Sequence, residues 1–299
     1  KLSWRRLVAR RPARRRSPRI RPRPATLETD RRAPEMVLAL LLVMMLLASV
    51  TTFHVSRRWY VPLALVWTVA FLLFGSIAGL SPAEMALGNW LPGLAWGLGA
   101  IGVVSLAMAA GVAIPRLHPL FADERVMGST GAQVAHKSLV EVPLGTVLLE
   151  EVVFRSVLLG LLTKLARDDL QLSHATTWGV VGSAFLFGLW HILPALEMHD
   201  SHSLTSQLGS GWGAKAATVT VTILATGGAG VVFALLVVVS GSVLAPMGLH
   251  WATNGPGSIA AWLVGRRRAR ADDAAEDGAA EAGAAEDGAA DDVGPADEQ

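Results

Sequence analysis

The sequence contains no cysteine and, for a chain of 299 residues, few charged side chains. The absence of cysteine excludes disulfide bonds, thiolate nucleophiles and zinc sites built on cysteine. Charged residues make up only 17% of the chain, whereas hydrophobic residues make up 52%. This composition favours a protein that crosses a membrane several times over a soluble domain.

Long stretches of the chain contain no Asp, Glu, Lys or Arg, and about 20 apolar residues are enough for a helix to cross the hydrocarbon layer. We therefore predict an all-α fold, a polytopic bundle of about 7–8 transmembrane spans. Seven are assigned, near 36–56, 59–80, 91–114, 138–164, 174–196, 216–240 and 243–265. Seven spans put the two ends on opposite sides, whereas basic segments at both ends favour the cytoplasm. We therefore expect one miscounted span, with an extra or re-entrant segment within 85–137.

The two ends of the chain differ in charge. Residues 1–34 hold 13 Lys or Arg and five prolines, a composition that predicts a disordered tail. A nucleic-acid arm and a cytoplasmic tail attracted to anionic lipid both fit this charge; the span that follows favours anionic lipid, and we expect no nucleic-acid partner. Residues 266–299 begin with RRRAR and become acidic, which predicts a second disordered tail. Between the tails we assign N-terminal helices (35–114), a polar loop (115–137) and a core (138–265).

Three charged residues interrupt the apolar segment LLEEVVFRSVLLGLL, at Glu150, Glu151 and Arg155. Such charges are costly within a membrane unless they are paired or face a water-filled cavity. Glu151 and Arg155 are four residues apart and can pair on one helix face, whereas Glu150 is rotated by about 100° and needs another partner. A purely structural ion pair beside a protonated Glu150 is one interpretation, and a hydrated functional site is the other.

Two histidines, His191 and His250, lie within apolar spans, and the other six lie in loops or near span ends. Phe187 precedes His191 by one helical turn, and Asn254 follows His250 by one turn. Each histidine alone could simply bond to a neighbouring helix. Together with Glu150, these polar groups fall on three spans, and packing those spans would satisfy them jointly. We expect Glu150, His191, His250 and Asn254 to converge on a single hydrated hollow.

These residue types suit amide hydrolysis without a covalent intermediate. A carboxylate between apolar walls can act as a general base toward water, and an imidazole can orient that water. A second histidine and an asparagine amide can donate hydrogen bonds to the oxygen that becomes negative during attack on a carbonyl.

Three short stretches, EEVVFR, FGLWH and HWATN, resemble patterns of the CPBP family of intramembrane proteases. This family includes the CAAX proteases and bacteriocin-processing enzymes and is also called the Abi family. Its patterns are Glu-Glu-x-x-x-Arg, Phe-x-x-x-His and His-x-x-x-Asn, in the same order. The resemblance covers about 138–265, and the stretch SGSVLAPMGLHWATN is similar to prokaryotic members. Ser156 is a departure, because many members have glycine there, and it bears on helix packing more than on chemistry.

The resemblance implies that Glu150 activates water with the help of His191. It implies that His250 and Asn254 stabilise the oxyanion. The supporting residues, which hold the helix or bind the substrate backbone, would be Glu151, Arg155 and Phe187.

The family has also been described as metalloproteases, which leaves a second mechanism open. In that version Glu150, His191 and His250 would bind Zn²⁺, with water in the open position. The sequence has no His-Glu-x-x-His helix, so the usual metalloprotease signature gives no support. We favour a metal-free site, with no certain cofactor, and keep zinc as an alternative.

We therefore predict an intramembrane endopeptidase of the prokaryotic plasma membrane, acting on a membrane-associated peptide or protein. One alternative is a non-catalytic scaffold or bacteriocin-immunity protein that uses the polar pocket for binding. Another is a proton- or ion-coupled transporter, although the sequence shows no inverted repeat. We also expect Pro246, four residues before His250, to kink its helix and admit an extended substrate.

Overall fold

The computed structural model describes residues 26–121, 123–199 and 211–291, and the long elements in these ranges are all helices. This confirms the predicted all-α fold. The longer helices are α1 (Thr26–His54), α2 (Arg57–Ile77), α3 (Trp90–Ala113), α8 (Ala175–Trp190), α9 (Ile192–His199), α11 (Trp212–Ser240) and α12 (Leu244–Asp291). Three short helices, η1 (Pro115–Phe121), α4 (Glu124–Met127) and α5 (Gly131–His136), cover the predicted polar loop.

The segment that carries Glu150 is a single continuous helix from Lys137 to Asp169 whose hydrogen-bond pattern changes along its length. It is π-helical in η2 (Lys137–Val147), η3 (Val152–Leu158) and η4 (Leu165–Asp169), and α-helical in α6 (Leu148–Glu151) and α7 (Leu159–Lys164). Every residue from 149 to 161 is buried, so this central helix forms the middle of the bundle. Turns of π-helix are rare and occur frequently at functional sites, and the two glutamates lie between two of them.

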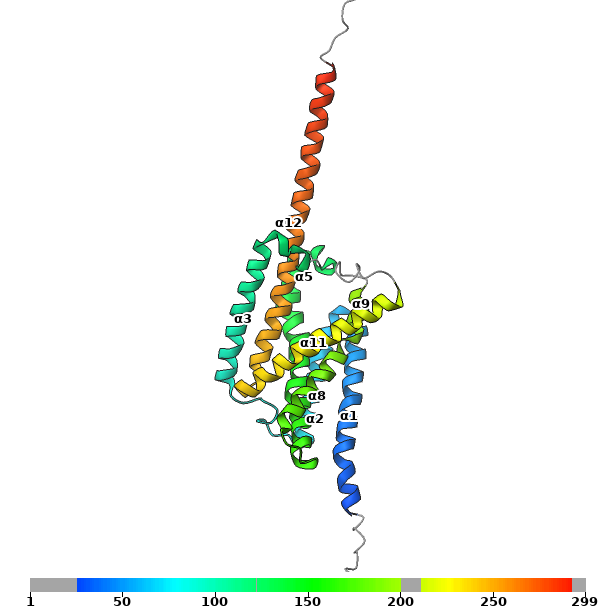
Figure 1. The fold of residues 1–299 in the computed structure, drawn as a ribbon, viewed down its shortest axis with the longest axis vertical. Helices are drawn as coiled ribbons and strands as arrows, with labels where there is room; N and C mark the ends of the chain where they lie inside the picture. Colours follow the sequence, from blue (N-terminus) through cyan, green and yellow to red (C-terminus); the bar gives the residue numbers. More distant parts are fainter. Residues whose placement is uncertain (1–25, 122, 200–210, 292–299) are drawn as a thin grey trace, which may run out of the picture.

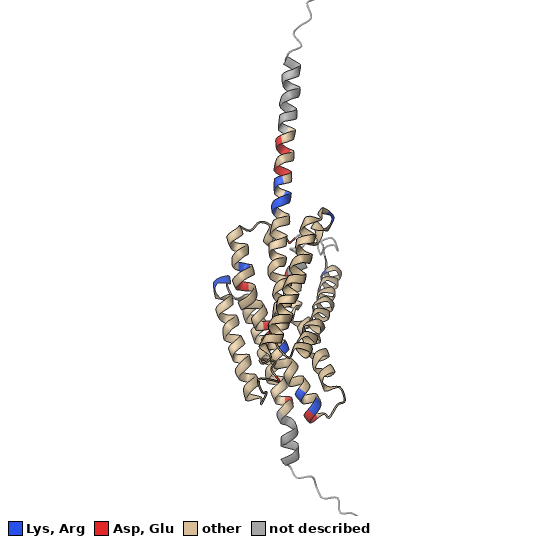
Figure 2. Cartoon of the chain, turned by 90° about the vertical axis from the view of Figure 1, so that its left-hand side faces the viewer, with Lys and Arg blue, Asp and Glu red and all other residues tan. Residues whose placement is uncertain are grey.

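Five helices are long and apolar enough to cross a membrane: Pro34–His54, Arg57–Ile77, Trp90–Ala113, Ala175–Glu197 and Trp212–Ser240. The central helix and the first part of α12 run through the same bundle, so the arrangement is roughly consistent with the predicted 7–8 spans. The chain is therefore a multi-pass membrane protein. Its charged side chains are sparse along the bundle and gather where α12 leaves it (Figure 2).

The two ends of the described chain lie at opposite ends of the bundle (Figure 1). Helix α1 begins at one end, and α12 projects from the other. Within 85–137 the described residues contain one long helix, α3, and only short helices besides it, so they add no further long span there. Residues 266–270 consequently lie at the opposite end of the bundle from the start of α1.

The terminal helices extend into both predicted tails. Helix α1 begins at Thr26, and α12 continues into the acidic segment as far as Asp291. Alanine has the highest helix propensity, and the alanine-rich sequence after residue 270 extends a helix that packing has already started. The remaining parts of the two predicted tails, residues 1–25 and 292–299, lie outside the described residues.

Close contacts at glycines set the positions of the helices that carry His191 and His250. A methyl group on Gly248 of α12 would lie only 2.5 Å from the Cα atom of Gly97 in α3. A methyl group on Gly188 of α8 would lie 2.7 Å from the carbonyl oxygen of Ile223 in α11. Small residues allow this approach, and membrane helices associate largely through such packing.

Pro246 does not kink its helix. Helix α12 begins at Leu244, so Pro246 lies in the first turn, where the backbone nitrogen has no helical acceptor to lose. The proline therefore helps to start the helix of His250, and the predicted kink is wrong.

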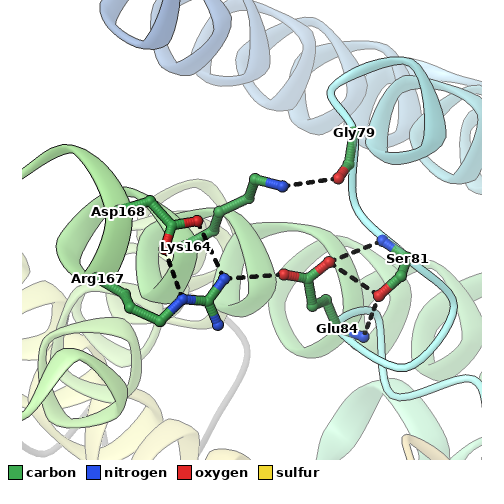
Figure 3. A network of polar contacts seen from close by, with 6 residues as sticks. All are labelled: Gly79, Ser81, Glu84, Lys164, Arg167 and Asp168. Atoms are coloured by element: carbon green, nitrogen blue, oxygen red, sulfur yellow. Dashed lines mark hydrogen bonds and ion pairs between the residues drawn. The ribbon is translucent and has the colours of Figure 1, made fainter.

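A polar network ties the loop after α2 to the far end of the central helix (Figure 3). Glu84 accepts hydrogen bonds from the backbone N–H of Ser81 at 2.9 Å and from its hydroxyl at 2.8 Å. Arg167 donates to the other oxygen of Glu84 at 3.1 Å, and Lys164 donates to the carbonyl of Gly79 at 2.8 Å. The Ser81 bonds, with help from Arg167, lower the pKa of Glu84 to about 2. The network therefore connects the loop after α2 to the end of the central helix through charged side chains outside the membrane core.

Candidate active site

Glu151 links Arg155 to His250 at the centre of the bundle. Its Oε1 atom lies 3.4 Å from Nη1 of Arg155 and 2.7 Å from Nδ1 of His250. Because an ionised carboxylate can only accept a hydrogen bond, Nδ1 of His250 carries the proton. The opposite ring atom, Nε2, lies 3.8 Å from Oε2 of Glu150. The sequence predicted the Glu151–Arg155 pair, and the structure extends it through His250 to Glu150.

Arg155 is held mainly by aromatic rings. Its side chain is 0% exposed, and none of its three guanidinium nitrogens has a hydrogen-bond partner among the described residues. The guanidinium carbon lies 4.0 Å from the ring centre of Phe187 and 4.9 Å from that of Phe233. Cation–π attraction is stronger away from water, so these rings stabilise the charge that Glu151 balances.

The same two rings contact the two histidines. The Phe187 ring meets the His191 ring edge to face, with centres 4.6 Å apart. The Phe233 ring is stacked on the His250 ring, with centres 5.1 Å apart. Phe187 was expected near the site, but Phe233 was not. Its helix, α11, is apolar along most of its length, so nothing in the sequence distinguishes Phe233 from the other apolar residues around it.

His191 lies at the junction of α8 and α9, where the chain leaves the helix. Its Nδ1 atom is 2.8 Å from the carbonyl oxygen of Phe187, so Nδ1 carries the proton and Nε2 of the neutral ring can accept one. The preceding residue, Trp190, donates its indole N–H to Oε1 of Glu150 at 3.1 Å. Trp190 was not predicted from the sequence, although the tryptophan in FGLWH offers an indole N–H inside a predicted span.

Three of the four predicted catalytic residues line two separate pockets, and neither of these pockets is lined by all four. His191 and Asn254 line a pocket of about 740 Å³. Glu150 lines a separate pocket of about 210 Å³. His250 is buried beside Glu150, and Pro194 lines both pockets.

The side chains do not fit the zinc alternative as they are arranged. Among the described residues, no group of three or more His, Asp or Glu is placed to hold a metal ion. His250 is within 3.8 Å of Glu150, but His191 opens on the other pocket.

Residues 137–255 match the model of a protein family described as type II CAAX prenyl endopeptidase Rce1-like. The matched segment starts with the central helix and ends directly after Asn254, so it contains all three sequence patterns. The match covers 119 of the 299 residues and supports a CAAX protease family, whose members are peptide hydrolases. Several apolar helices accompany this segment in a multi-pass membrane protein. Comparisons with curated proteins and with solved structures gave no match.

One position departs from the pattern of CAAX proteases. Ser156, where glycine was expected after the arginine, is fully buried. Its hydroxyl has no hydrogen-bond partner among the described residues. The central helix therefore accommodates the extra atoms, at the cost of an unsatisfied polar group.

Proposed function

We propose that this CAAX protease hydrolyses a peptide bond with a water molecule activated by Glu150, without a metal ion. The observation that carries the proposal is the asymmetry of the Glu150 carboxylate. Trp190 holds Oε1, whereas buried Oε2 has no hydrogen-bond partner among the described residues. A fixed carboxylate with one available oxygen can bind a water molecule and accept its proton.

His250 is suited to stabilising the oxyanion. With a proton on each nitrogen, its Nδ1–H donates to Glu151 and its Nε2–H is directed toward the Glu150 side of the site. The buried cluster then holds two positive groups, Arg155 and His250, and two negative groups, Glu150 and Glu151, which limits the cost of burying each charge. An N–H fixed in this way can donate to an oxygen that becomes negative.

His191 and Asn254 face the larger pocket, which we assign to the peptide. Nε2 of His191 can accept a hydrogen bond from the peptide backbone, and the Asn254 amide can donate to the carbonyl oxygen. The volume of about 740 Å³ is in the range of ligand pockets. Its apolar wall, which includes Met108, Leu120 and Phe121, suits a substrate that is itself associated with the membrane. We place the enzyme in a prokaryotic plasma membrane, following the similarity of its HWATN region to prokaryotic members.

The test compares the purified wild type with Glu150→Gln in liposomes that contain a digest of bacterial membrane proteins. New peptide ends are identified by mass spectrometry. Glu150→Gln should reduce cleavage by about 10²–10⁴-fold, as is typical for loss of a general base. Glu84→Gln, a carboxylate outside the site, is the matched control and should retain cleavage.

Full turnover by Glu150→Gln would contradict the proposal. Restoration of a chelator-treated enzyme by zinc would contradict its metal-free form. Binding of peptides by the wild type without any new peptide ends would favour the non-catalytic alternative.

A further inference from the structure

The smaller pocket is lined by Glu150, whereas the larger pocket is not. The smaller pocket is also lined by hydroxyl groups of Ser49 and Thr52 from α1 and of Tyr60 from α2, together with Trp190. The first three residues lie outside the segment that matches the CAAX protease family. The N-terminal helices therefore contribute polar residues to the pocket that contains Glu150.

A side-chain hydrogen bond separates the two pockets. The Tyr60 hydroxyl lies 2.8 Å from Oγ1 of Thr146. Tyr60 lines the smaller pocket and Thr146 lines the larger one, so their bond forms part of the wall between them. Gly145 makes this arrangement possible, because a methyl group at that position would collide with the Tyr60 ring.

The smaller pocket also lies close to the membrane edge. Ser49 is five residues before the end of α1 and Tyr60 three residues after the start of α2, so they lie about 7 Å and 5 Å from these helix ends. The edge is marked by the ion pair between Arg57 and Glu141, in which the Arg57 side chain is 59% exposed. Glu150 follows Glu141 by nine residues, which corresponds to a depth of at most about 13 Å along the central helix, part of which is π-helical. The residues that line the smaller pocket therefore lie between these helix ends and Glu150.

We propose that the smaller pocket is a hydration chamber that supplies the attacking water to Glu150 while a peptide occupies the larger pocket. This inference rests on the proposed function. Each hydrolysis consumes one water molecule, and a bound peptide covers the larger pocket. The smaller pocket, about 210 Å³, has room for about seven water molecules at about 30 Å³ each.

The proposed hydrolysis needs only the water molecule, the peptide and the Glu150 carboxylate. The water oxygen forms a bond to the carbonyl carbon as one of its protons passes to the Glu150 carboxylate. The carbon–nitrogen bond then breaks, and Glu150 returns the proton to the leaving amine. The next water enters from the smaller pocket, so the peptide products need not leave first.

The absence of cysteine in the chain allows a direct test with single introduced cysteines. Ser49→Cys places a thiol in the smaller pocket, Thr226→Cys places one in the larger pocket, and Val50→Cys is a control at the same depth. Val50 is 39% exposed on the outer surface of α1. A small charged methanethiosulfonate reacts with the thiolate, which forms only where water is present.

Ser49→Cys should react at least ten times faster than Val50→Cys. A cleavable peptide, added to variants that also carry Glu150→Gln, should protect Thr226→Cys and leave the reaction of Ser49→Cys unchanged. An unreactive Ser49→Cys, or one protected by the peptide as strongly as Thr226→Cys, would overturn the proposal.

Activity gives an independent measurement. Ser49→Leu should fill part of the smaller pocket and lower kcat by about tenfold with little change in KM. Ser76→Leu, the same substitution at an exposed position on α2, should leave both constants unchanged. Full kcat in Ser49→Leu, with Glu150→Gln inactive, would overturn the water route and leave the proposed function standing. Full turnover in Glu150→Gln would instead reject the proposed function itself.

Discussion

The imidazole of His250 is stacked on the ring of Phe233, with their planes 27° apart, while its Nδ1–H bonds to Glu151. The ring contact and the hydrogen bond together fix the direction of Nε2. A displaced imidazole would weaken the proposed hydrogen bond from His250 to the oxyanion, which forms in the transition state. Loss of the Phe233 ring should therefore affect kcat more than KM.

Phe233→Leu should therefore lower kcat by about tenfold and leave KM within twofold. The measurement is steady-state cleavage of a peptide identified as a substrate. Phe185→Leu, the same change at a residue 60% exposed on α8, is the control and should have no effect. Equal losses in the two variants would show that Phe233 has no special role in positioning His250.

Removal of either partner of the buried Glu151–Arg155 pair should destabilise the protein strongly. Arg155→Met leaves Glu151 without its cation, and Glu151→Gln leaves Arg155 without its anion. Each change should reduce the free energy of unfolding by about 3–5 kcal/mol, as found when one partner of a buried pair is removed. Denaturant unfolding in detergent micelles measures this quantity.

The double variant, with both substitutions, should be more stable than the sum of the single effects predicts, because no buried charge is left alone. Additive losses would show that the two side chains act independently, contrary to their distance of 3.4 Å.

The contact between α3 and α12 should tolerate no side chain larger than hydrogen at its centre. Gly97→Val would push against the carbonyl oxygen of Leu244, which lies 2.9 Å from the position of an added methyl group. We expect a lower melting temperature and loss of cleavage, because α12 carries His250. Gly102→Val is the control, since an added methyl group there meets nothing within 4 Å. A wild-type melting temperature for Gly97→Val would contradict this packing.

Stability should fall in acid partly because of Glu84. The pKa of Glu84 is lowered to about 2 in the folded protein, below its ordinary value of 4.5. Its contribution is therefore complete above about pH 4.5 and is lost as the pH falls toward 2. Because the side chain is 27% exposed, we expect a contribution of only about 1 kcal/mol.

Melting temperatures of the wild type and Glu84→Gln, measured from pH 6 to pH 2.5, check this expectation. The variant should melt lower at pH 6, and the difference should shrink in acid. Glu35→Gln, at an exposed carboxylate of α1, should follow the wild type. A constant difference at all pH values would show that the network of Figure 3 does not depend on the Glu84 charge.

The sequence was sufficient to predict the helical bundle and the pair of Glu151 and Arg155, because both follow from local patterns. A long apolar run determines a span, and a spacing of four residues determines a shared helix face. The bond from His250 to Glu151 could not be predicted in this way. It depends on how two helices are rotated against each other, and no period within one helix encodes that rotation.

The same limit explains why Phe233 and Tyr60 were missed. In a membrane protein, lipid-facing and buried surfaces are both apolar, so hydrophobic periodicity does not show which side of a helix faces its neighbours. Phe185 is exposed and Phe233 is buried, although each lies in an apolar helix. Close contacts at glycines show which side of a helix faces a neighbour, but they can be recognised only when the neighbouring helix is known.

The extension of α12 beyond the bundle has a consequence for whatever surrounds the protein. From Gly265 to Asp291 the helix is about 39 Å long. It begins with a basic collar at residues 266–270 and continues with exposed acidic residues, Asp272, Asp273, Glu276 and Asp277. An anionic bilayer would attract the basic residues and repel the acidic residues that follow them, so we expect the helix to point away from the lipid surface.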